Sequence, residues 1–357
     1  MTNNKKILAR SQHFFITFCA LSEAKGMDIM MTSKERVIKT IKFQSPDRIP
    51  VDLWVLPAGY IEHGEKLEKL VYDRGIDFVR VPYNDPTFDE RHYKVGSYKD
   101  VWGCVWKNAQ EGIIGEVKEH PLADYKHLMN YRSPINLLKG GFEKTDDFIE
   151  VNRDKFMLGG WISIFERMQF IRGTENLFMD IAEQSNELFI LRDIVVDFYK
   201  EYLRQWLEHD VDGICFGDDW GSQRSLLISP ASWREIFKPV YKELFDMIKS
   251  KGKYVFFHSD GYIMDLYQEF IDLGVDAINS QLWCMGVENV AEKFAGKLCF
   301  WGELSRQDTL PNGTPEEIIK KAELMKKHLF LNGGLIGQSE VGRDVPMKNV
   351  EAVLTCW

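Results

Sequence analysis

Short runs of apolar residues recur along the chain, separated by longer segments in which apolar residues repeat at helical spacing. Runs without polar alternation are typical of strands that helices cover on both faces of a parallel sheet. They predict eight strands, over residues 49–55, 77–81, 156–160, 213–217, 254–257, 277–280, 298–301 and 334–338. Eight buried strands alternating with helical segments favour a (β/α)8 TIM barrel over a doubly wound sheet.

Capping residues mark where several helices begin. Thr32 and Glu35 have the spacing of a capping box. Ser229-Pro230 places a cap before a first-turn proline, and Thr314 caps the helix before the last strand. One long helical stretch is predicted from about residue 175 to residue 208.

The pattern changes after the second strand. Between residues 88 and 120, short alternating runs with glycine at the turns replace the helical spacing. Residues 101–106 and 112–117 are predicted to form a β-hairpin inserted into the barrel. No internal repeat or linker divides the chain, so residues 32–357 are predicted to form one domain.

The first residues differ from the rest. Two lysines precede a short apolar run at residues 14–21, which is the order of a signal peptide, but no small-residue cleavage site follows. Three methionines stand just before the first predicted helix, at Met27, Met30 and Met31. Residues 1–31 are therefore predicted to be a dispensable leader that is disordered or precedes the true start of translation.

Composition and charge exclude several classes of protein. The 357 residues are 45% hydrophobic and 28% charged, which allows a large packed core. The formal net charge of −9 argues against binding of nucleic acid. The six cysteines form no C-x-x-C pair, as expected of reduced thiols, and no apolar run reaches membrane-spanning length. No glycine-rich dinucleotide or P-loop motif follows a strand. We expect a cytoplasmic protein without nucleic-acid or membrane partners.

The candidate chemistry lies at the carboxyl ends of the predicted strands, where barrels place their active sites. These positions are rich in carboxylates, with one imidazole and several aromatic rings, and only Arg343 nearby is basic. They are Asp52, Trp54, Asp85, Trp161, Asp218, Asp219, His258, Asp260, Gln281, Glu303, Ser339 and Glu340. Converging carboxylates repel one another unless a cation or protons lie among them, and one histidine with carboxylates suits zinc or another divalent ion. Alternatively, Asp218 and Glu303 bind neighbouring loops through hydrogen bonds.

His258 and Asp260 follow the most apolar of these strands. They are two residues apart, so both side chains can face the same side. This spacing predicts a shared site. The alternative is that the two residues cap the strand and the helix that follows it.

Six motifs together are similar to those of one enzyme superfamily. They are Ser45–Asp52 (SPDRIPVD), Phe216–Gly221 (FGDDWG), Phe257–Gly261 (FHSDG), Gly274–Asn279 (GVDAIN), Phe300–Leu304 (FWGEL) and Leu310–Glu317 (LPNGTPEE). From Thr32 to its end, the chain resembles the uroporphyrinogen decarboxylase-like superfamily, whose barrel also serves corrinoid-dependent methyltransferases. The resemblance specifies the superfamily more sharply than the activity.

The decarboxylases of that superfamily hold substrate carboxylates with the arginines of an R-Q-A-G-R-Y segment. The matching stretch here, Val55–Tyr60, contains neither arginine. Asp85 lies roughly where the decarboxylases place their acidic residue. A barrel end lined with acidic residues repels a substrate with many carboxylates. Porphyrinogen decarboxylation is therefore the alternative function.

The methyltransferase branch resembles the chain better. Its thiol-methylating members bind zinc through a His-x-Cys motif and a later cysteine. Here His258 matches the histidine, Asp260 stands in place of the cysteine, and Glu340 lies near the position of the later cysteine. The resemblance therefore implies a divalent ion, zinc first, held by His258, Asp260 and Glu340. An oxygen-rich site of this kind is less suited to a thiol and fits demethylation of a methoxy compound.

The resemblance implies transfer of a methyl group from a methoxylated small molecule to cob(I)alamin on a separate corrinoid protein, or from methylcobalamin to an acceptor. His258, Asp260, Glu303 and Asp218 are the expected catalytic residues. The expected substrate contacts are Trp54, Asp85, Asp219, Trp220, Gln281 and Trp161, although tryptophans in barrels also fill cores. A barrel that binds a corrinoid protein or a ligand without turnover is a third possibility. A homodimer is left open.

Overall fold

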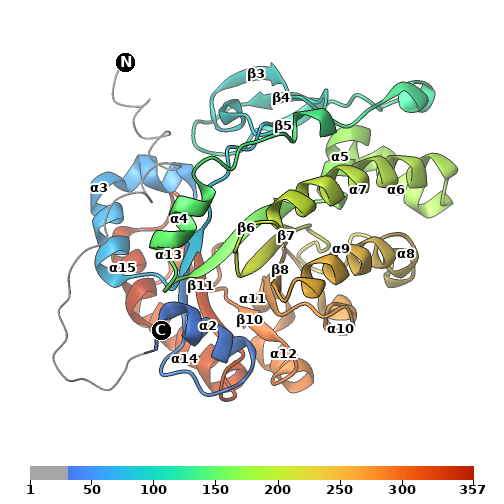
Figure 1. Cartoon of the computed structure of the whole chain (residues 1–357). Helices are drawn as coiled ribbons and strands as arrows, with labels where there is room; N and C mark the ends of the chain where they lie inside the picture. The colour runs from blue at the N-terminus through green and yellow to red at the C-terminus, as the bar shows by residue number, and fades with distance from the viewer. Residues whose placement is uncertain (1–30) are drawn as a thin grey trace. The chain divides into compact units, whose positions relative to one another are not determined.

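The computed structural model of the chain describes residues 31–357 (Figure 1). The predicted leader, residues 1–31, lies outside this range except for Met31. Eight parallel strands form one sheet in the order β1-β11-β10-β9-β8-β7-β6-β2, and helices lie between them in the chain. Six strands, β6 to β11, follow one another in space as they do in sequence. This is the order of a nearly closed (β/α)8 barrel, so the predicted fold class is confirmed.

The described residues divide into two compact units. The first comprises residues 31–82, Lys144–Leu158 and Asp276–Trp357, and the second comprises Tyr83–Glu143 and Gly159–Val275. The prediction of a single domain over residues 32–357 stays a prediction.

The first unit holds the amino-terminal and carboxyl-terminal strands with their helices. Its strands are β1 (Val51–Val55), β2 (Phe78–Arg80), the start of β6 (Phe156–Ile162), β9 (Ala277–Ser280), β10 (Cys299–Trp301) and β11 (Leu335–Val341). Its helices are α2 (Ser33–Ile41), α3 (Pro57–Arg74), α4 (Thr145–Val151), α11 (Leu282–Met285), α12 (Val287–Phe294), α13 (Thr309–Asn312), α14 (Pro315–Leu329) and α15 (Met347–Thr355).

The second unit holds the middle of the chain. Its strands are the end of β6, β7 (Gly213–Gly217) and β8 (Tyr254–Ser259), with β3 (Gly96–Lys99), β4 (Val105–Asn108) and β5 (Glu116–Glu119) in the insertion. Its α-helices are α5 (Phe165–Arg172), α6 (Thr174–Glu183), α7 (Asn186–Trp206), α8 (Pro230–Ile236), α9 (Lys238–Ser250) and α10 (Tyr267–Asp272). Four short 3-10 helices complete it, η1 (Glu90–Tyr93), η2 (Tyr125–Asn130), η3 (Ile135–Leu137) and η4 (Met264–Leu266).

The predicted helix starts are confirmed. The Thr32 side chain accepts from the Glu35 N–H while the Glu35 carboxylate accepts from the Thr32 N–H, which is a complete capping box. Thr314 and Glu317 form a second one before α14. Ser229 caps α8 directly before Pro230.

The predicted long helical stretch over residues 175–208 is helical almost throughout, but it consists of two helices. α6 ends at Glu183, and Gln184 adopts a left-handed conformation with φ 53°. Ser185 then caps α7 by accepting a hydrogen bond from the Leu188 N–H. Ser185 is a good cap in the middle of an apolar helical pattern, so the apolar spacing concealed the break.

The inserted sheet has one strand more than the predicted hairpin. β3, β4 and β5 form an antiparallel sheet in that order, and β4 pairs with both neighbours. Arg167 of α5 contacts the insertion. Its guanidinium lies 4.9 Å from the Trp102 ring centroid and 3.8 Å from the Asp100 carboxylate. The insertion therefore packs on α5, the helix that follows β6.

One buried carboxylate links several segments near the start of the first unit. Asp77 is fully buried and accepts hydrogen bonds from Arg36 at 2.6 Å, from Arg48 at 2.7 Å and from the Val51 N–H at 2.7 Å. The Asp77 N–H in turn donates to the Val51 carbonyl at 2.9 Å, so the beginnings of β1 and β2 are linked. Part of the Ser45–Asp52 motif therefore has a structural role.

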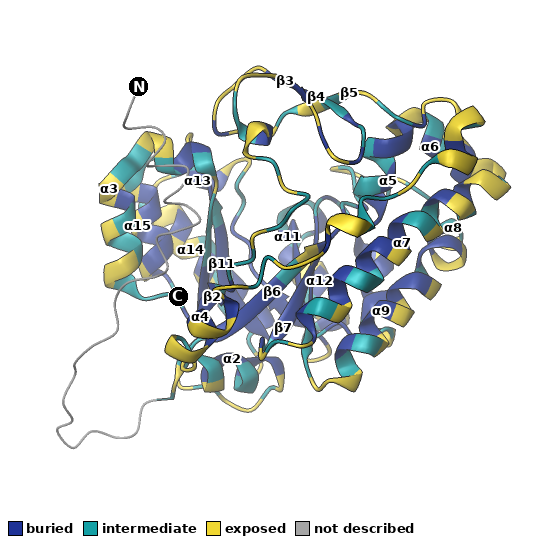
Figure 2. Cartoon of the chain, turned by 45° about the horizontal axis from the view of Figure 1, so that its top comes forward, coloured by how far each residue is buried: buried dark blue, intermediate teal, exposed yellow. Residues whose placement is uncertain are grey.

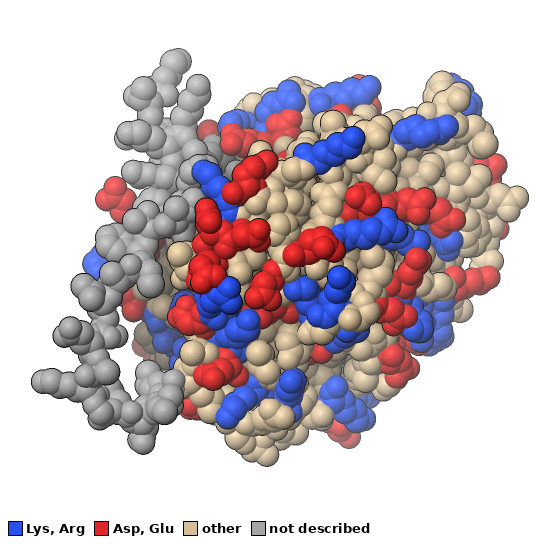
Figure 3. Space-filling view, viewed as in Figure 1, with Lys and Arg blue, Asp and Glu red and all other residues tan. Residues whose placement is uncertain are grey.

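Burial follows the expected pattern for helices over a parallel sheet. β7 is buried along its whole length, and α7 and α9 each show a buried stripe and an exposed stripe (Figure 2). Charged side chains of both signs are interspersed on the face drawn in Figure 3. Exposed charged residues four positions apart on a helix form ion pairs, such as Lys242 with Asp246 of α9 at 2.7 Å. Within residues 31–357, no helix is both long enough and apolar enough to cross a membrane.

Candidate functional site

The end of β8 and the loop after β7 carry the candidate site, inside the second unit. The two strands pair in parallel with Gly217 opposite His258, so polar residues that follow each strand meet at one edge. Stacked phenylalanine rings of Phe216 and Phe257, 6.1 Å apart, lie on the two strands just before these polar residues. The apolar core thus ends where the polar site begins.

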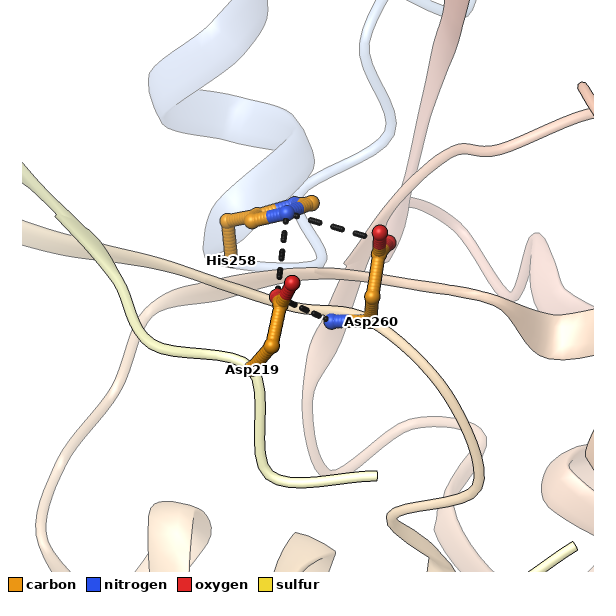
Figure 4. A group of neighbouring side chains, drawn as sticks. All are labelled: Asp219, His258 and Asp260. Atoms are coloured by element: carbon orange, nitrogen blue, oxygen red, sulfur yellow. Dashed lines mark hydrogen bonds and ion pairs between the residues drawn. The ribbon is translucent and has the colours of Figure 1, made fainter. Parts of the chain in front are cut away.

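Three side chains converge at this edge (Figure 4). Nε2 of His258 lies 3.5 Å from Oδ1 of Asp219 and 3.7 Å from Oδ1 of Asp260. The Asp260 N–H donates to the same Asp219 oxygen at 2.8 Å. We refer to Asp219, His258 and Asp260 as the site triad. The prediction that His258 and Asp260 face the same side is confirmed, and Asp219, expected only as a substrate contact, joins them.

The spacing of the site triad suits a divalent ion. One potential ligand atom from each residue lies within 4.8 Å of the other two. Nitrogen and oxygen ligands sit at about 2.0–2.2 Å from zinc, which places neighbouring ligands of a tetrahedral ion about 3.4 Å apart. The two distances from His258 to the carboxylates are close to this value, so the residues fit the ion.

Two glycines hold the loops of the site triad together. Gly261 has φ +80°, and a Cβ there would lie 2.2 Å from the carbonyl oxygen of Gly221. A Cβ at Gly221 would in turn lie 2.5 Å from the Tyr262 nitrogen. The loops therefore touch backbone to backbone, and the Gly221 N–H donates to the Asp260 carbonyl at 3.1 Å. This contact fixes the distance between Asp219 and Asp260.

Trp161 forms a flat wall beside the site triad. It lies near the end of β6, remains 42% exposed, and its ring centroid is 6.0 Å from that of His258. A Cβ on Gly217 would lie only 2.0 Å from the Trp161 ring, so the indole rests on the glycine backbone. The predicted role of Trp161 as a substrate contact stays a prediction, and its exposure is compatible with it.

Asp218 anchors the loop rather than facing solvent. It is fully buried and accepts hydrogen bonds from the N–H groups of Ile164 at 2.8 Å and Glu166 at 2.9 Å and from the Tyr241 hydroxyl. Burial raises the pKa of Asp218 to about 6, against the opposing effect of these hydrogen bonds. Its contacts favour a positioning role over direct contact with a substrate.

Glu166, in the first turn of α5, is a residue that the sequence interpretation missed. Its carboxyl group lies 2.8 Å from the Ser163 hydroxyl. Burial, followed by the nearby carboxylates of Asp219 and Asp218, raises the pKa of Glu166 to about 8. Its position four residues after β6 was a usable signal, because acids just beyond strand ends are candidates for barrel sites.

Two other predicted substrate contacts have different surroundings. Trp220 is fully buried and stacks on Phe165 at 4.3 Å, which favours a place in the core over contact with a substrate. Asp85 accepts hydrogen bonds from the N–H of Thr87 at 2.8 Å and from its hydroxyl at 2.7 Å, so it caps its own turn.

In the first unit, Trp54 belongs to a cluster around Asp52. The Asp52 carboxylate accepts from the indoles of Trp54 at 3.1 Å and Trp301 at 3.0 Å, and from Arg80 at 2.9 Å. The Arg80 guanidinium lies 5.3 Å from the Trp301 ring centroid. Arg80 follows Val79 near the end of β2, where the sequence interpretation had named no basic residue.

The acids predicted on the later strands share an arginine. Arg306 donates to Glu340 at 2.7 Å and lies 3.8 Å from Glu303, whose side chain is almost completely buried. Gln281 is buried, and its backbone carbonyl accepts a hydrogen bond from the Cys284 thiol at 3.1 Å. The prediction that only Arg343 is basic near the strand ends is therefore wrong, since Arg80 and Arg306 lie there as well. Metal binding by Glu340 stays a prediction.

Comparison with known proteins establishes the family. A family model described as uroporphyrinogen decarboxylase (URO-D) matches residues 108–356, more than half of the chain. The chain belongs to the URO-D family. All residues of the site triad lie inside the matched segment of this URO-D family member, whereas the Ser45–Asp52 motif lies outside it. No curated protein gives a match to the chain.

Solved structures that resemble this URO-D family protein have low sequence identity to it. A methyltransferase from Methanosarcina mazei is 18% identical, covers 91% of this chain and 98% of its own, and superposes with a TM-score of 0.69, which shows a shared fold. A chitinase from Chromobacterium violaceum is 11% identical over 87% of this chain and 98% of its own, with a TM-score of 0.41. A dihydropteroate synthase from Anaplasma phagocytophilum is 16% identical over 54% of this chain and 71% of its own, with a TM-score of 0.33.

Proposed function

We propose that this URO-D family protein is a methyltransferase that takes the methyl group of a methoxylated small molecule and gives it to cob(I)alamin on a separate corrinoid protein. The site triad is the observation that carries the proposal, because it offers one imidazole and two carboxylates at strand ends. The structure of the methyltransferase from Methanosarcina mazei supports the proposal, because the match with this chain extends over 98% of the methyltransferase.

The chemistry of the ligand set supports an oxygen substrate. Asp219, His258 and Asp260 would hold a divalent ion, with zinc as the first candidate, and Glu340 is a further candidate ligand. When bound, such an ion draws electron density from an ether oxygen and makes its methyl group a better target. Carboxylate ligands suit a hard oxygen donor better than a thiolate, which favours a methoxy group over a thiol.

The bonds that break and form in this reaction determine which side chains the protein must supply. The methyl carbon–oxygen bond breaks with its electron pair staying on oxygen, and the oxygen gains a proton. The electron pair of cob(I)alamin forms the new carbon–cobalt bond. Trp161 would pack against the substrate, His258 and Asp260 would orient its oxygen, and Asp218 would fix the loop that carries Asp219. Glu303 is proposed to orient the substrate from the later strands.

Porphyrinogen decarboxylation remains the second candidate function. Arg80 and Arg306 supply positive charge near strand ends, which a substrate with many carboxylates requires. Arg80, however, binds Asp52, and Arg306 binds Glu340. Because each guanidinium already faces a carboxylate, the first function is better supported.

The proposal is tested by methyl transfer from a panel of methoxylated compounds to cob(I)alamin, with wild type compared with His258→Ala. Loss of one electrostatic contribution to the transition state costs about a hundred- to a thousandfold in rate. Circular dichroism and a thermal melt control for folding. Equal rates in the two proteins would refute the role of His258. No transfer from any donor, with decarboxylation of a porphyrinogen, would establish the second candidate, and neither activity would favour a non-catalytic barrel.

A further inference from the structure

The tryptophan beside the site triad is held in place by its backbone and by its ring. Gly160, the residue before Trp161 on β6, has φ +66°, a conformation that glycine adopts at little cost and that turns the backbone. The Trp161 N–H then donates to the Tyr202 hydroxyl at 3.3 Å. One side of the indole lies against Gly217 of β7, where a Cβ would come within 2.0 Å of the ring. The orientation of the indole is therefore set before any ligand binds.

The rest of this indole is open. Trp161 stays 42% exposed, although tryptophan is usually one of the more buried residues. Because Gly217 covers one side, the exposed surface lies away from β7. His258 borders the indole with 6.0 Å between ring centroids, and the 41° angle between the ring planes shows that the imidazole does not lie flat on it. An exposed and oriented aromatic ring next to the site triad suits a ligand that stacks.

We infer that Trp161 selects an aryl methyl ether, whose aromatic ring stacks on the open side of the indole while its oxygen faces the site triad. The inference rests on the proposed function and names its substrate class. In the reaction the bond between the methyl carbon and the aryl oxygen breaks, and its electron pair stays on that oxygen. The electron pair of cob(I)alamin forms the carbon–cobalt bond. The aryl oxygen takes a proton from water, and a phenol leaves.

The leaving group favours an aryl ether over an alkyl ether. A phenol such as the tyrosine side chain has an ordinary pKa of about 10, whereas water, which resembles an aliphatic alcohol, has a pKa of about 15.7. A phenolate therefore takes the electron pair of the broken bond much more readily than an alkoxide does. A flat ring also covers more of the indole than a puckered aliphatic ring of the same size.

A methylated cation is the other kind of ligand that a tryptophan ring attracts. The carboxylates of Asp219 and Asp260 would add to this attraction while they carry their charges. A divalent ion held by the site triad neutralises both carboxylates and repels a second cation. A neutral aromatic ether experiences no such repulsion, and its oxygen can face the ion. The proposed ion site therefore favours the ether.

Binding tests the inference without turnover. Methoxybenzene and methoxycyclohexane share their ring size and their methoxy group, but only methoxybenzene has a flat aromatic ring. Calorimetric titration of the full chain with zinc present should show at least about fivefold tighter binding of methoxybenzene, as stacking on one aromatic residue typically contributes. Absence of this preference in wild type would overturn the inference. Tighter binding of tetramethylammonium than of methoxybenzene would also overturn it, in favour of a cationic ligand.

Variants test whether the indole causes the preference. Trp161→Leu should remove it, because leucine keeps an apolar side chain without a flat ring, whereas Trp161→Phe should keep most of it. Tyr72→Leu removes an aromatic ring that is 70% exposed on α3 and is the matched control. A thermal melt of each variant controls for folding. A preference that survives Trp161→Leu would refute the role of Trp161.

Methyl transfer gives a second readout. Trp161→Leu should lower kcat/KM for methoxybenzene by at least about fivefold and leave kcat/KM for methoxycyclohexane nearly unchanged. Equal losses with the two ethers would refute selection by stacking. If wild type transfers a methyl group from no ether to cob(I)alamin, the proposed function fails, while the binding preference still decides whether the site stacks an aromatic ring.

Discussion

The backbone N–H of Asp260 donates a hydrogen bond to Oδ1 of Asp219, 2.8 Å away, across the two loops of the site triad. The same oxygen faces Nε2 of His258 at 3.5 Å. One carboxylate oxygen therefore faces both the Asp260 backbone and the His258 ring, and so links the two loops. This arrangement orients the Asp219 side chain before any ligand arrives.

Metal affinity should depend on each residue of the site triad. We expect His258→Ala and Asp219→Ala to weaken zinc binding by at least about tenfold each, because even residues that only orient a ligand contribute this much. Competition with a chelating indicator measures the affinity. Asp246→Asn, an exposed residue paired with Lys242, is the control. Equal affinity in all four proteins would exclude a metal at this site.

Glu340 allows a separate test of the predicted ligand set. If it binds the ion, Glu340→Gln should weaken zinc binding as much as His258→Ala does. If it only neutralises Arg306, zinc affinity should stay unchanged and thermal stability should fall, because Arg306 loses its partner at 2.7 Å. Zinc titration of these two variants therefore decides whether Glu340 is a ligand.

The glycine contact between the loops should be intolerant of a side chain. Gly261→Ala combines an unfavourable φ with a Cβ 2.2 Å from a backbone oxygen. Gly252 also has a positive φ, +70°, but no atom lies within 4 Å of the place that a methyl group would take there, so Gly252→Ala isolates the effect of φ. We expect Gly261→Ala to lose at least about 1 kcal/mol more than Gly252→Ala in urea unfolding. Equal losses would show that the loops can separate.

Stability should also depend on the hydroxyl of Tyr241. Tyr241→Phe leaves Asp218 without one of its donors in a fully buried site, which typically costs about 1–3 kcal/mol. Tyr72→Phe, at an exposed position, should change stability by less than about 0.5 kcal/mol. Chemical unfolding of the two variants measures the difference, and a Tyr241→Phe variant as stable as Tyr72→Phe would contradict the prediction.

Asp77 should control stability in acid. Burial raises its pKa, but hydrogen bonds from Arg48 and from the Val51 N–H, with the charge of Arg48, lower it below the ordinary 3.8. Because the folded pKa is the lower one, this stabilisation is present above pH 3.8 and is lost as the pH falls through the folded pKa.

The test of Asp77 is an Asn variant. Asp77→Asn leaves Arg36 and Arg48 without the buried charge and should cost about 3–5 kcal/mol at neutral pH. The difference between variant and wild type should shrink in acid. Asp73→Asn, at an exposed ion pair, is the control, and a loss no larger than its own would contradict the prediction.

Glu166 should act in the opposite direction. Its pKa rises from about 4.5 to about 8 on folding, so stability falls as the pH rises between these values. Glu166→Gln lacks this dependence. Unfolding curves between about pH 5 and pH 8 should therefore show wild type losing stability relative to the variant, and parallel curves would contradict the shift.

The barrel could be predicted because each strand is a run of apolar residues with polar residues at its end. His258 and Asp260 were found in this way, since their spacing of two residues across the end of β8 places them on the same side. Asp219 was assigned to the substrate because its closeness to Asp260 depends on the loop contact of Gly221 with Gly261, which no local pattern encodes. Glu166 was missed for a related reason, because it lies on a helix and reaches Ser163 by a turn.

Charge pairing across long separations was equally hidden. Arg306 and Glu340 are 34 residues apart, and Arg80 and Asp52 are 28 apart. Sequence counts of acids and bases at strand ends therefore gave a more acidic picture than the structure has. Similarly, the break between α6 and α7 depends on the left-handed conformation of one residue, Gln184, within an apolar repeat that continues across it.

The backbone contact between Gly221 and Gly261 determines where the site lies, whereas the side chains determine which ligand it can bind. Main-chain atoms hold the loops at this contact, so the side chains at positions 258 and 260 can be exchanged while Gly221 and Gly261 stay in contact. Single substitutions, in evolution or by mutagenesis, can then replace hard ligand atoms with softer ones. Asp260→Cys would turn an oxygen donor into a sulfur donor on an unchanged frame, and would direct the same barrel toward a softer ion or substrate.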